Sequence, residues 1–308
     1  MFATLLGALP RPSADGAVES LIEVAVAAQA EAGLEPITDG RLRGFAIDRV
    51  PDPREVVAAW RFVAGTTDRA VKQALPGPYT VGRHLAADTA PAERAAATLR
   101  AASELRSIAE ALAMAGCPLV EIEESEAHRI GDDTRERELF RSAHRQLTEG
   151  IDGTHLSLSI SGGSVWSAGL ETIIDAPYAS LAVDLIAGPD NWNLVTRLPG
   201  DRGVIAGALP AKDSPADAKE TLLWAARYAA GTRGRGLDRV GLGSAGSWAN
   251  LTWEAAVAKM QRLGEAARLA AMPAGPALAR QLDPRAVSAR TAAMGHRPTD
   301  DGGEQAAG

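Results

Sequence analysis

Short β-prone runs alternate with longer helical stretches along almost the whole chain, and this alternation limits the possible folds more than any other feature. Helical periodicity predicts helices near residues 16–32, 53–65, 79–87, 91–116, 134–149, 213–231 and 252–271. Runs of apolar and β-branched residues predict eight strands: Thr4–Leu9, Glu35–Asp39, Gln73–Gly77, Leu119–Glu124, Thr154–Ile160, Ser180–Leu185, Val204–Leu209 and Arg239–Gly243. Regular alternation of strand and helix favours a parallel sheet of the α/β class. Eight such units favour a single-domain (β/α)8 TIM barrel over an open sheet.

The same pattern predicts one domain followed by a tail. No linker divides residues 1–280, so we expect this range to be one barrel domain. Residues 281–308 end in the polar, glycine-rich sequence DDGGEQAAG. Such a composition is typical of a flexible segment, and we expect this tail to be flexible.

Composition argues against several classes of partner. The 308-residue chain has a formal net charge of −7, whereas nucleic-acid binding needs a basic face. No run of about 18 apolar residues is present, so no membrane partner is expected. The opening MFATLLGALPRP lacks the basic and long apolar regions of a signal peptide, which predicts a cytoplasmic location. The single cysteine, Cys117, excludes a disulfide within the chain.

Candidate site residues follow from the barrel prediction, because barrel chemistry lies at the carboxyl ends of the strands. Trp248 follows the last predicted strand and can line a pocket there, although packing under a loop or a subunit contact explains it equally well. His144 is predicted to face solvent from a helix. The side chains nominated by the strand ends are Arg41, Arg43, Tyr79, Glu123, Glu124, Ser125, His155, Ser157, Asp184 and Ser244.

The fourth predicted strand carries an unusual group of carboxylates. Strand alternation places Glu121 and Glu123 on one face and Glu124 on the other. Like charges crowded in a low-dielectric barrel mouth raise the pKa of one carboxyl. A raised pKa is what a general base near neutral pH requires, so Glu123 is the predicted base and Glu121 a neighbouring contact.

Several motifs at the predicted strand ends resemble those of one known family. In chain order they are TLLGALPRP (4–12), GLEPITDGRLRG (33–44), LPGPYTVGR (75–83), AGCPLVEIEESE (115–126), THLSLS (154–159) and VGLGSAGS (240–247). They are similar to the strand-end motifs of the catalytic domain of cobalamin-independent methionine synthase. The resemblance implies a barrel with its site at the carboxyl ends of the strands, and a divergent member that lacks the zinc cysteines.

The resemblance also implies a change in metal chemistry. The family holds a catalytic zinc ion with His, Cys, Glu and Cys. The matching positions here are His155, Ser157, Asp184, and Ala245 or Gly246. A serine hydroxyl is a poor zinc ligand, so we expect no zinc, no other metal and no cofactor. Because zinc activates the attacking thiol in that family, methionine synthesis from a folate donor is not expected here.

The substrate pocket implied by the resemblance changes as well. Arg41 stands where the family has a Glu that contacts the substrate's ammonium. This reversal of charge favours a carboxylate, sulfate or phosphate at that point, and Arg43 can add to it. Glu123 matches the family's substrate-binding Asp, and Tyr79, Ser125, Ser157 and Trp248 are the further predicted substrate contacts.

Each assignment has an ordinary structural alternative. His155 can be a hydrogen-bonded core residue, and Arg41 can form a surface salt bridge with Asp39 or Asp48. Glu123 can pair with an arginine at the barrel mouth. Asp184 can cap the helix that follows its strand.

Three functions fit these residues. The first is a metal-independent enzyme of specialised metabolism that acts on a small, anionic, amino-acid-like substrate. It would catalyse a nucleophilic displacement, for example an intramolecular cyclisation with loss of sulfate, with Glu123, His155 and Asp184 as catalytic residues. The second is a methyl or alkyl transferase that uses a folate or a thiol. The third is a non-catalytic subunit that acts in a heterocomplex, and the sequence does not distinguish such a complex from a homodimer.

Overall fold

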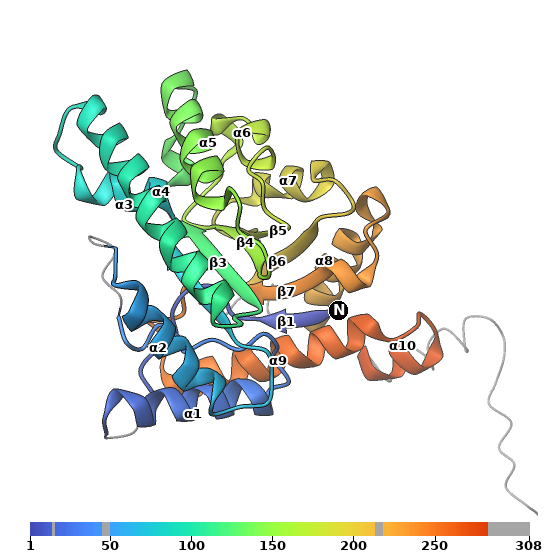
Figure 1. Ribbon diagram of the computed structural model, residues 1–308. Helices are drawn as coiled ribbons and strands as arrows, with labels where there is room; N and C mark the ends of the chain where they lie inside the picture. The colour runs from blue at the N-terminus through green and yellow to red at the C-terminus, as the bar shows by residue number, and fades with distance from the viewer. Residues whose placement is uncertain (14–15, 45–49, 213–217, 283–308) are drawn as a thin grey trace, which may run out of the picture.

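A computed structural model describes residues 1–13, 16–44, 50–212 and 218–282 of the chain. Seven parallel strands form one curled sheet in the order β1-β7-β6-β5-β4-β3-β2, with helices on its outer side (Figure 1). The strands are β1 (Phe2–Thr4), β2 (Lys72–Pro76), β3 (Leu119–Glu124), β4 (His155–Ile160), β5 (Ser180–Asp184), β6 (Gly203–Leu209) and β7 (Val240–Ser244). The longer helices are α1 (Val18–Glu31), α2 (Pro53–Ala64), α3 (Pro78–Leu85), α4 (Pro91–Met114), α5 (Thr134–Thr148), α8 (Lys219–Gly231) and α9 (Trp253–Ala271).

The predicted class and most predicted elements are confirmed, with small differences at their ends. Three short helices were not predicted: α6 (Leu170–Ile174), α7 (Trp192–Arg197) and α10 (Pro276–Leu282). The first part of the helix predicted at 213–231 and most of the tail predicted at 281–308 lie outside the described residues. No helix in the described ranges has both the length and the apolar composition needed to cross a membrane.

The second predicted strand, Glu35–Asp39, is not a regular strand, so the sheet has seven strands instead of the predicted eight. Only Ile37 forms a β-bridge, to Val71. Pro36 has no N–H to donate to a neighbouring strand. The N–H and C=O of Thr38 bond instead to the side chain of Gln29 on α1, at 3.0 and 2.8 Å. The segment still lies between the two edge strands.

Backbone hydrogen bonds from this segment reach both edges of the sheet. Glu35 N–H donates to the carbonyl of Ala3 in β1 at 2.8 Å. On the other side, Lys72 N–H in β2 donates to the carbonyl of Ile37 at 2.9 Å. An irregular segment therefore occupies the place where a further strand was predicted.

The first strand lies earlier in the chain than predicted. It covers Phe2–Thr4, and the predicted continuation to Leu9 is a loop. The N–H and C=O of Leu6 both bond to the hydroxyl of Ser244, at 2.7 and 2.8 Å. The Ser244 side chain, at the end of β7, thus provides the hydrogen bonds that a neighbouring strand would otherwise make with the Leu6 N–H and C=O groups. Ser244 was nominated as a site residue, and the structure gives it this backbone role.

The two faces of the sheet differ in chemistry. The outer face carries apolar side chains such as Val120, Ile122 and Leu158, which join one continuous core with Ile108 and Leu112 of α4. The inner face carries a small apolar cluster of Leu6, Ala182 and Ile205, with Phe2 packed against it. The buried polar and charged residues on this inner face are Lys72, Glu121, Glu123, Ser157, Ser159, Ser180 and Asp184.

A buried ion pair lies on the inner face between β2 and β3. Lys72 Nζ donates to Glu121 Oε2 at 2.8 Å and to the carbonyl of Leu5 at 2.6 Å. Both side chains are almost fully buried, with exposed fractions of 1% and 2%. Burial lowers the pKa of the Lys72 ammonium, and the neighbouring Glu121 carboxylate opposes that shift. The pair ties two strands to the loop that follows β1.

We predict that Lys72→Met lowers the free energy of unfolding by about 3–5 kcal/mol, because it leaves the Glu121 carboxylate buried and unpaired. Adding Glu121→Leu removes the second charge and is expected to restore most of the loss. Urea unfolding of the single and double variants measures both effects. Lys219→Met, which removes a partly exposed partner of Glu265, is the matched control and is expected to change stability by less than about 1 kcal/mol. A double variant no more stable than Lys72→Met would contradict the assignment.

Candidate functional site

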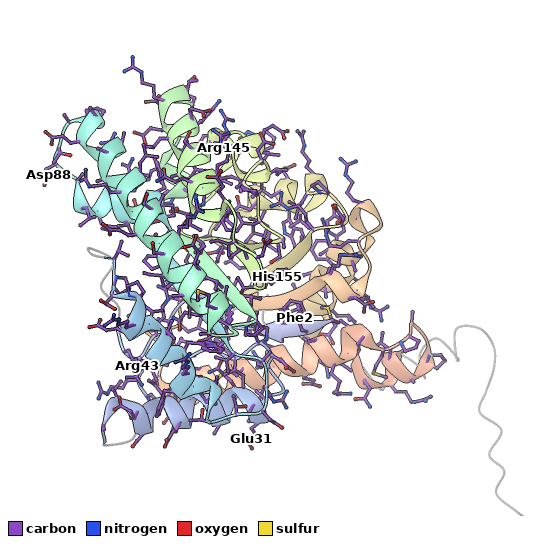
Figure 2. The ribbon with its side chains drawn as sticks, viewed as in Figure 1. Phe2, Glu31, Arg43, Asp88, Arg145 and His155 are labelled. Atoms are coloured by element: carbon purple, nitrogen blue, oxygen red, sulfur yellow. The ribbon has the colours of Figure 1, made fainter. Side chains whose placement is uncertain are left out.

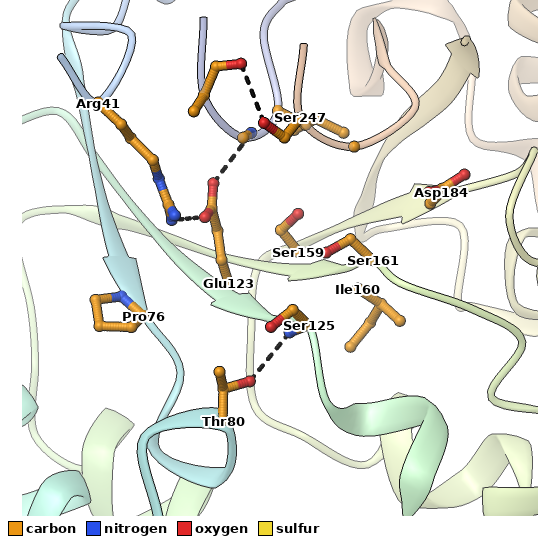
Figure 3. A pocket seen from close by; sticks show the side chains of 14 residues that line it. Arg41, Pro76, Thr80, Glu123, Ser125, Ser159, Ile160, Ser161, Asp184 and Ser247 are labelled. Carbon is orange, nitrogen blue, oxygen red and sulfur yellow. Dashed lines mark hydrogen bonds and ion pairs between the residues drawn. The ribbon is translucent and has the colours of Figure 1, made fainter. Parts of the chain in front are cut away.

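A cavity of about 160 Å³ lies at the carboxyl ends of the strands (Figure 3). This is the end at which parallel barrels carry their sites. Its lining comes from the ends of β2, β3, β4 and β5, from the loops after β1, β3, β4 and β7, from the start of α3 and from the segment at Arg41. The lining residues are Leu6, Gly7, Ala8, Arg41, Pro76, Thr80, Glu123, Ser125, Ser159, Ile160, Ser161, Asp184, Gly246 and Ser247.

An ion pair between Arg41 and Glu123 lines one side of this cavity (Figure 3). The other oxygen of Glu123 accepts the N–H of Gly7 at 3.2 Å. Arg41 adopts a positive φ of 57°, and its N–H donates to Asp39 Oδ1 at 2.9 Å. Burial raises the pKa of the Asp39 carboxyl, although the N–H of Arg41 opposes this. The left-handed turn at Arg41 directs its side chain towards Glu123.

This pairing bears on two of the structural alternatives. Glu123 pairs with an arginine at the mouth, as the alternative reading proposed, and that arginine is Arg41 itself. The proposed Arg41–Asp39 contact is made through the backbone N–H and not as a salt bridge. Asp48 lies outside the described residues.

Asp184 lines the opposite side of the cavity, at the end of β5. Its Oδ1 accepts the N–H groups of Ile186 and Ala187, at 2.9 and 2.8 Å. Asp184 therefore caps the turn after its strand through one oxygen. Nearby, Ser159 and Ser161 come from the end of β4 and also face the cavity.

Glu124 supports the cavity from the outer face of β3. Its carboxylate accepts the N–H groups of Tyr79 and Thr80, at 2.9 and 2.7 Å, and the hydroxyl of Thr80 at 2.5 Å. The Thr80 oxygen in turn accepts the N–H of Ser125 at 3.0 Å. Glu124 therefore fixes the start of α3 and, through Thr80, the loop that carries Ser125 into the cavity. The predicted alternation of Glu123 and Glu124 on opposite faces is confirmed.

His144 completes this support and was predicted wrongly to face solvent. It is fully buried, with Nε2 3.1 Å from Glu124 Oε1 and Nδ1 2.7 Å from the hydroxyl of Tyr178. Helix α5 consists mostly of polar residues, so its sequence does not clearly show which face packs on the sheet. A buried Glu–His–Tyr chain thus lies directly behind the strand that carries Glu123.

The structure does not bring all predicted residues to the cavity. His155 begins β4 and so lies at the amino end of the sheet, where it lines another cavity together with Phe2 (Figure 2). The prediction that it lies beside Glu123 and Asp184 is wrong. Its Nε2 is 2.8 Å from Ser180 Oγ, and Ser180 donates to Ser157 at 2.9 Å. Ser157 is likewise below the cavity and does not line it.

Four further predicted contacts also lie away from the cavity. Arg43 points outward, pairs with Glu19 and stacks on the ring of Phe62. The hydroxyl of Tyr79 bonds to Glu136, at 2.6 Å. Trp248 is buried under the loops, as its alternative reading proposed. Glu121 lies on the inner face in its pair with Lys72. Of the predicted substrate contacts, only Arg41 and Ser125 line the cavity.

Sequence reasoning missed several lining residues, including Thr80, Ser159, Ser161 and Ser247. The signal for Ser159 and Ser161 was present. They stand at the end of the predicted strand 154–160 and before Gly162, whereas His155 stands at its beginning. Choosing residues at the carboxyl end of this predicted strand would have identified both serines.

The lining does not fit a zinc ion of the kind that the family with similar motifs holds. Zinc prefers thiolate, imidazole and carboxylate ligands in a tetrahedral set. The cavity offers the carboxylate of Asp184, a second carboxylate already paired with Arg41, and serine hydroxyls. Within the described ranges, no group of three or more His, Cys, Asp or Glu side chains is arranged to hold a metal. Cys117 is buried beside the carbonyl of Leu119, the first residue of β3, at the other end of the sheet.

Comparison with solved structures identifies the fold. A B12-independent methionine synthase from Shewanella sp. W3-18-1, in complex with selenomethionine, matches with a TM-score of 0.70 and 14% identity, over 87% of this chain and 96% of that chain. The chain shares its fold with B12-independent methionine synthases. A putative enzyme of that kind from Listeria monocytogenes matches with a TM-score of 0.65 and 15% identity, over 87% and 97% of the two chains.

A methyltransferase from Methanosarcina mazei matches less closely, with a TM-score of 0.56 and 15% identity over 86% and 94% of the two chains. No protein-family model matches the sequence, and no curated protein matches it. The resemblance inferred from the strand-end motifs is thus supported at the level of the fold.

We predict that Gly77→Ala destabilises the protein by about 1–3 kcal/mol, because the added methyl group overlaps the buried Glu124 carboxylate. Gly77 has an ordinary φ of −77°, so the effect is steric and not a backbone effect. Urea unfolding measures it. Gly231→Ala is the matched control, since a Cβ there meets nothing within 4 Å, and its φ is −74°. Equal effects of the two substitutions would contradict this account.

We also predict that the purified protein, dialysed against micromolar zinc and then against buffer, retains far less than one zinc ion per chain. Metal analysis by mass spectrometry measures the ratio. Stoichiometric zinc that disappears in Asp184→Asn would show that the cavity binds the metal after all. Zinc that persists in that variant would come from another part of the chain.

Proposed function

We propose that the chain is an enzyme that acts on a small, amino-acid-like substrate with an anionic group, by nucleophilic displacement and without zinc. The main support for the proposal is the Arg41–Glu123 ion pair, which lines a cavity at the carboxyl ends of the strands. A guanidinium and a carboxylate in contact provide an anion-binding group and a proton acceptor at one point.

The two residues of the pair have different roles in the proposed reaction. Glu123 accepts a proton from the nucleophilic N–H or O–H group of the substrate as that atom bonds to carbon. The bond from this carbon to the leaving oxygen breaks, and sulfate or phosphate departs with the electron pair. Arg41 holds the departing anion. In an intramolecular cyclisation, all the atoms come from the substrate and Glu123 later returns its proton to water.

The small size of the cavity supports a small substrate. Its volume of about 160 Å³ is below the roughly 300–1,000 Å³ typical of sites for drug-sized ligands. Leu6, Pro76 and Ile160 offer an apolar wall against which a short side chain can pack. Holding nucleophile and leaving group in line can lower the barrier by roughly 7–11 kcal/mol, and such alignment requires no metal.

The fold comparison supports an amino-acid-like substrate. The Shewanella protein of the same fold was solved with selenomethionine, a molecule that carries both an ammonium and a carboxylate. The cavity here also presents both charges, on Arg41 and on the carboxylates of Glu123 and Asp184. A zwitterion of amino-acid size matches this arrangement better than a simple anion does.

We predict that the purified protein releases sulfate or phosphate from amino acids that carry a sulfate or phosphate ester on the side chain. Mass spectrometry of the organic product and ion chromatography of the anion measure the reaction. Arg41→Ala and Glu123→Gln are expected to lower kcat/KM by about 100-fold or more, because each removes a group that acts in the transition state.

Arg54→Ala, which removes an exposed arginine on α2, is the matched control and is expected to leave turnover unchanged. Unchanged turnover in Arg41→Ala and Glu123→Gln would show that the roles are wrong. Methyl transfer to a thiol from a folate, without release of an inorganic anion, would favour the methyltransferase alternative.

A further inference from the structure

Asp184 stands apart from the other charged side chains of the cavity. Arg41 and Glu123 compensate each other. Asp184 has an exposed fraction of only 5%, yet no cation pairs with it in the described part of the chain. A nearly buried carboxylate without a counter-ion attracts a cation from the ligand that fills the cavity.

The two oxygens of Asp184 have different roles. Oδ1 is occupied by the N–H groups of Ile186 and Ala187. Oδ2 accepts no hydrogen bond from the described residues. It lies beside Gly246, where an added Cβ would be 3.4 Å from it, and Gly246 lines the same cavity. One oxygen therefore orients the carboxylate, and the other is open to a ligand.

Two serines line the cavity between Glu123 and Asp184 (Figure 3). Ile160 of β4 pairs with Val183 of β5, so Ser161 and Asp184 each directly follow a paired residue at the ends of neighbouring strands. Alternation places Ser159 on the same inner face. Both serines line the cavity, and Ser159 has an exposed fraction of only 3%. Within the described residues, neither hydroxyl bonds to a protein atom.

These three acceptors suit a primary ammonium. An –NH3⁺ group has three donors and no acceptor, which matches one carboxylate oxygen and two hydroxyl oxygens. A sulfate or phosphate would meet the Asp184 charge and be repelled. Ca²⁺ takes six to eight oxygen ligands, whereas this group offers one free carboxylate oxygen and two hydroxyl oxygens.

We propose that Asp184, Ser159 and Ser161 form a subsite for a primary ammonium group of the ligand, across the cavity from Arg41. The amino-acid substrate class rests on the function proposed above, whereas the subsite itself does not. By the motif resemblance, Asp184 matches one zinc-ligand position, and Ala245 or Gly246 matches another. A cationic group of the ligand then lies where the family holds its metal ion.

The test uses three ligands that differ only in their charged groups: L-methionine, 3-(methylthio)propylamine, which lacks the carboxylate, and 4-(methylthio)butanoate, which lacks the ammonium. Calorimetry measures their binding in buffer with EDTA. Asp184→Asn is expected to weaken the first two ligands by about 10- to 100-fold and to leave the butanoate unchanged. Ser159→Ala and Ser161→Ala are each expected to weaken the same two ligands by a few fold.

Asp152→Asn, at an exposed position, is the matched control and is expected to change none of the three. The subsite is wrong if the wild-type protein does not bind the amine at millimolar concentration. It is also wrong if Asp184→Asn weakens all three ligands equally, or if amine binding requires added Mg²⁺ or Zn²⁺. Should Asp184→Asn fail to fold, the two serine variants decide in the same way.

A separate result tests the proposed function. Arg41→Ala is expected to weaken L-methionine and the butanoate but not the amine. If Arg41→Ala leaves the butanoate unchanged while Asp184→Asn still weakens the amine, the ammonium subsite stands and the anion-binding role of Arg41 falls.

Discussion

Charge pairing on the inner face of the sheet is the constraint on which the rest of the site depends. Ionised groups taken out of water are stable only when each has a partner or several hydrogen bonds. Lys72 meets this requirement for Glu121, and Arg41 meets it for Glu123. The first pair lies on the strands below the cavity and joins β2, β3 and the β1 loop. The second lies in the cavity, where a ligand can reach it.

The two pairs therefore differ in what they can do. Lys72 and Glu121 are almost fully buried, so separating them has a high free-energy cost and they serve the fold. The Arg41 side chain has an exposed fraction of 30%, and it comes from an irregular segment rather than a strand. An incoming anion can exchange for Glu123 as its partner, which frees the carboxylate to accept a proton. The inner face thus holds a buried charge pair next to a more accessible one.

Two consecutive residues of β3 have different roles, because their side chains lie on opposite faces of the strand. Glu123 faces the cavity, and Glu124 faces the helices, where Tyr79, Thr80 and His144 surround it. Because the two are consecutive, any movement of Glu124 shifts the backbone that carries Glu123. The Gly77 position, which has no room for a side chain beside Glu124, belongs to the same arrangement.

The sequence predicted the order of elements well because buried strands and amphipathic helices have distinct periods. It failed where side chains replace backbone partners, as Gln29 does for Thr38 and Ser244 does for Leu6. No local pattern reveals those long-range bonds. Arg41 and Arg43 were also indistinguishable in sequence, and only the positive φ at Arg41 separates the one that enters the cavity. His155 was misplaced because motif similarity outweighed its position at the start of its strand.

Similarity of fold fixes where a site lies but not which chemistry it performs. In the family that the strand-end motifs resemble, a zinc ion brings a concentrated positive charge to the ends of the strands. This chain has serine hydroxyls and one unpaired carboxylate at that place, so its own electrostatics there are negative. A negative, hydroxyl-lined end opposite a guanidinium gives the cavity a polarity. In the proposed function, this polarity orients a zwitterionic ligand with its amine towards Asp184 and its anionic group towards Arg41.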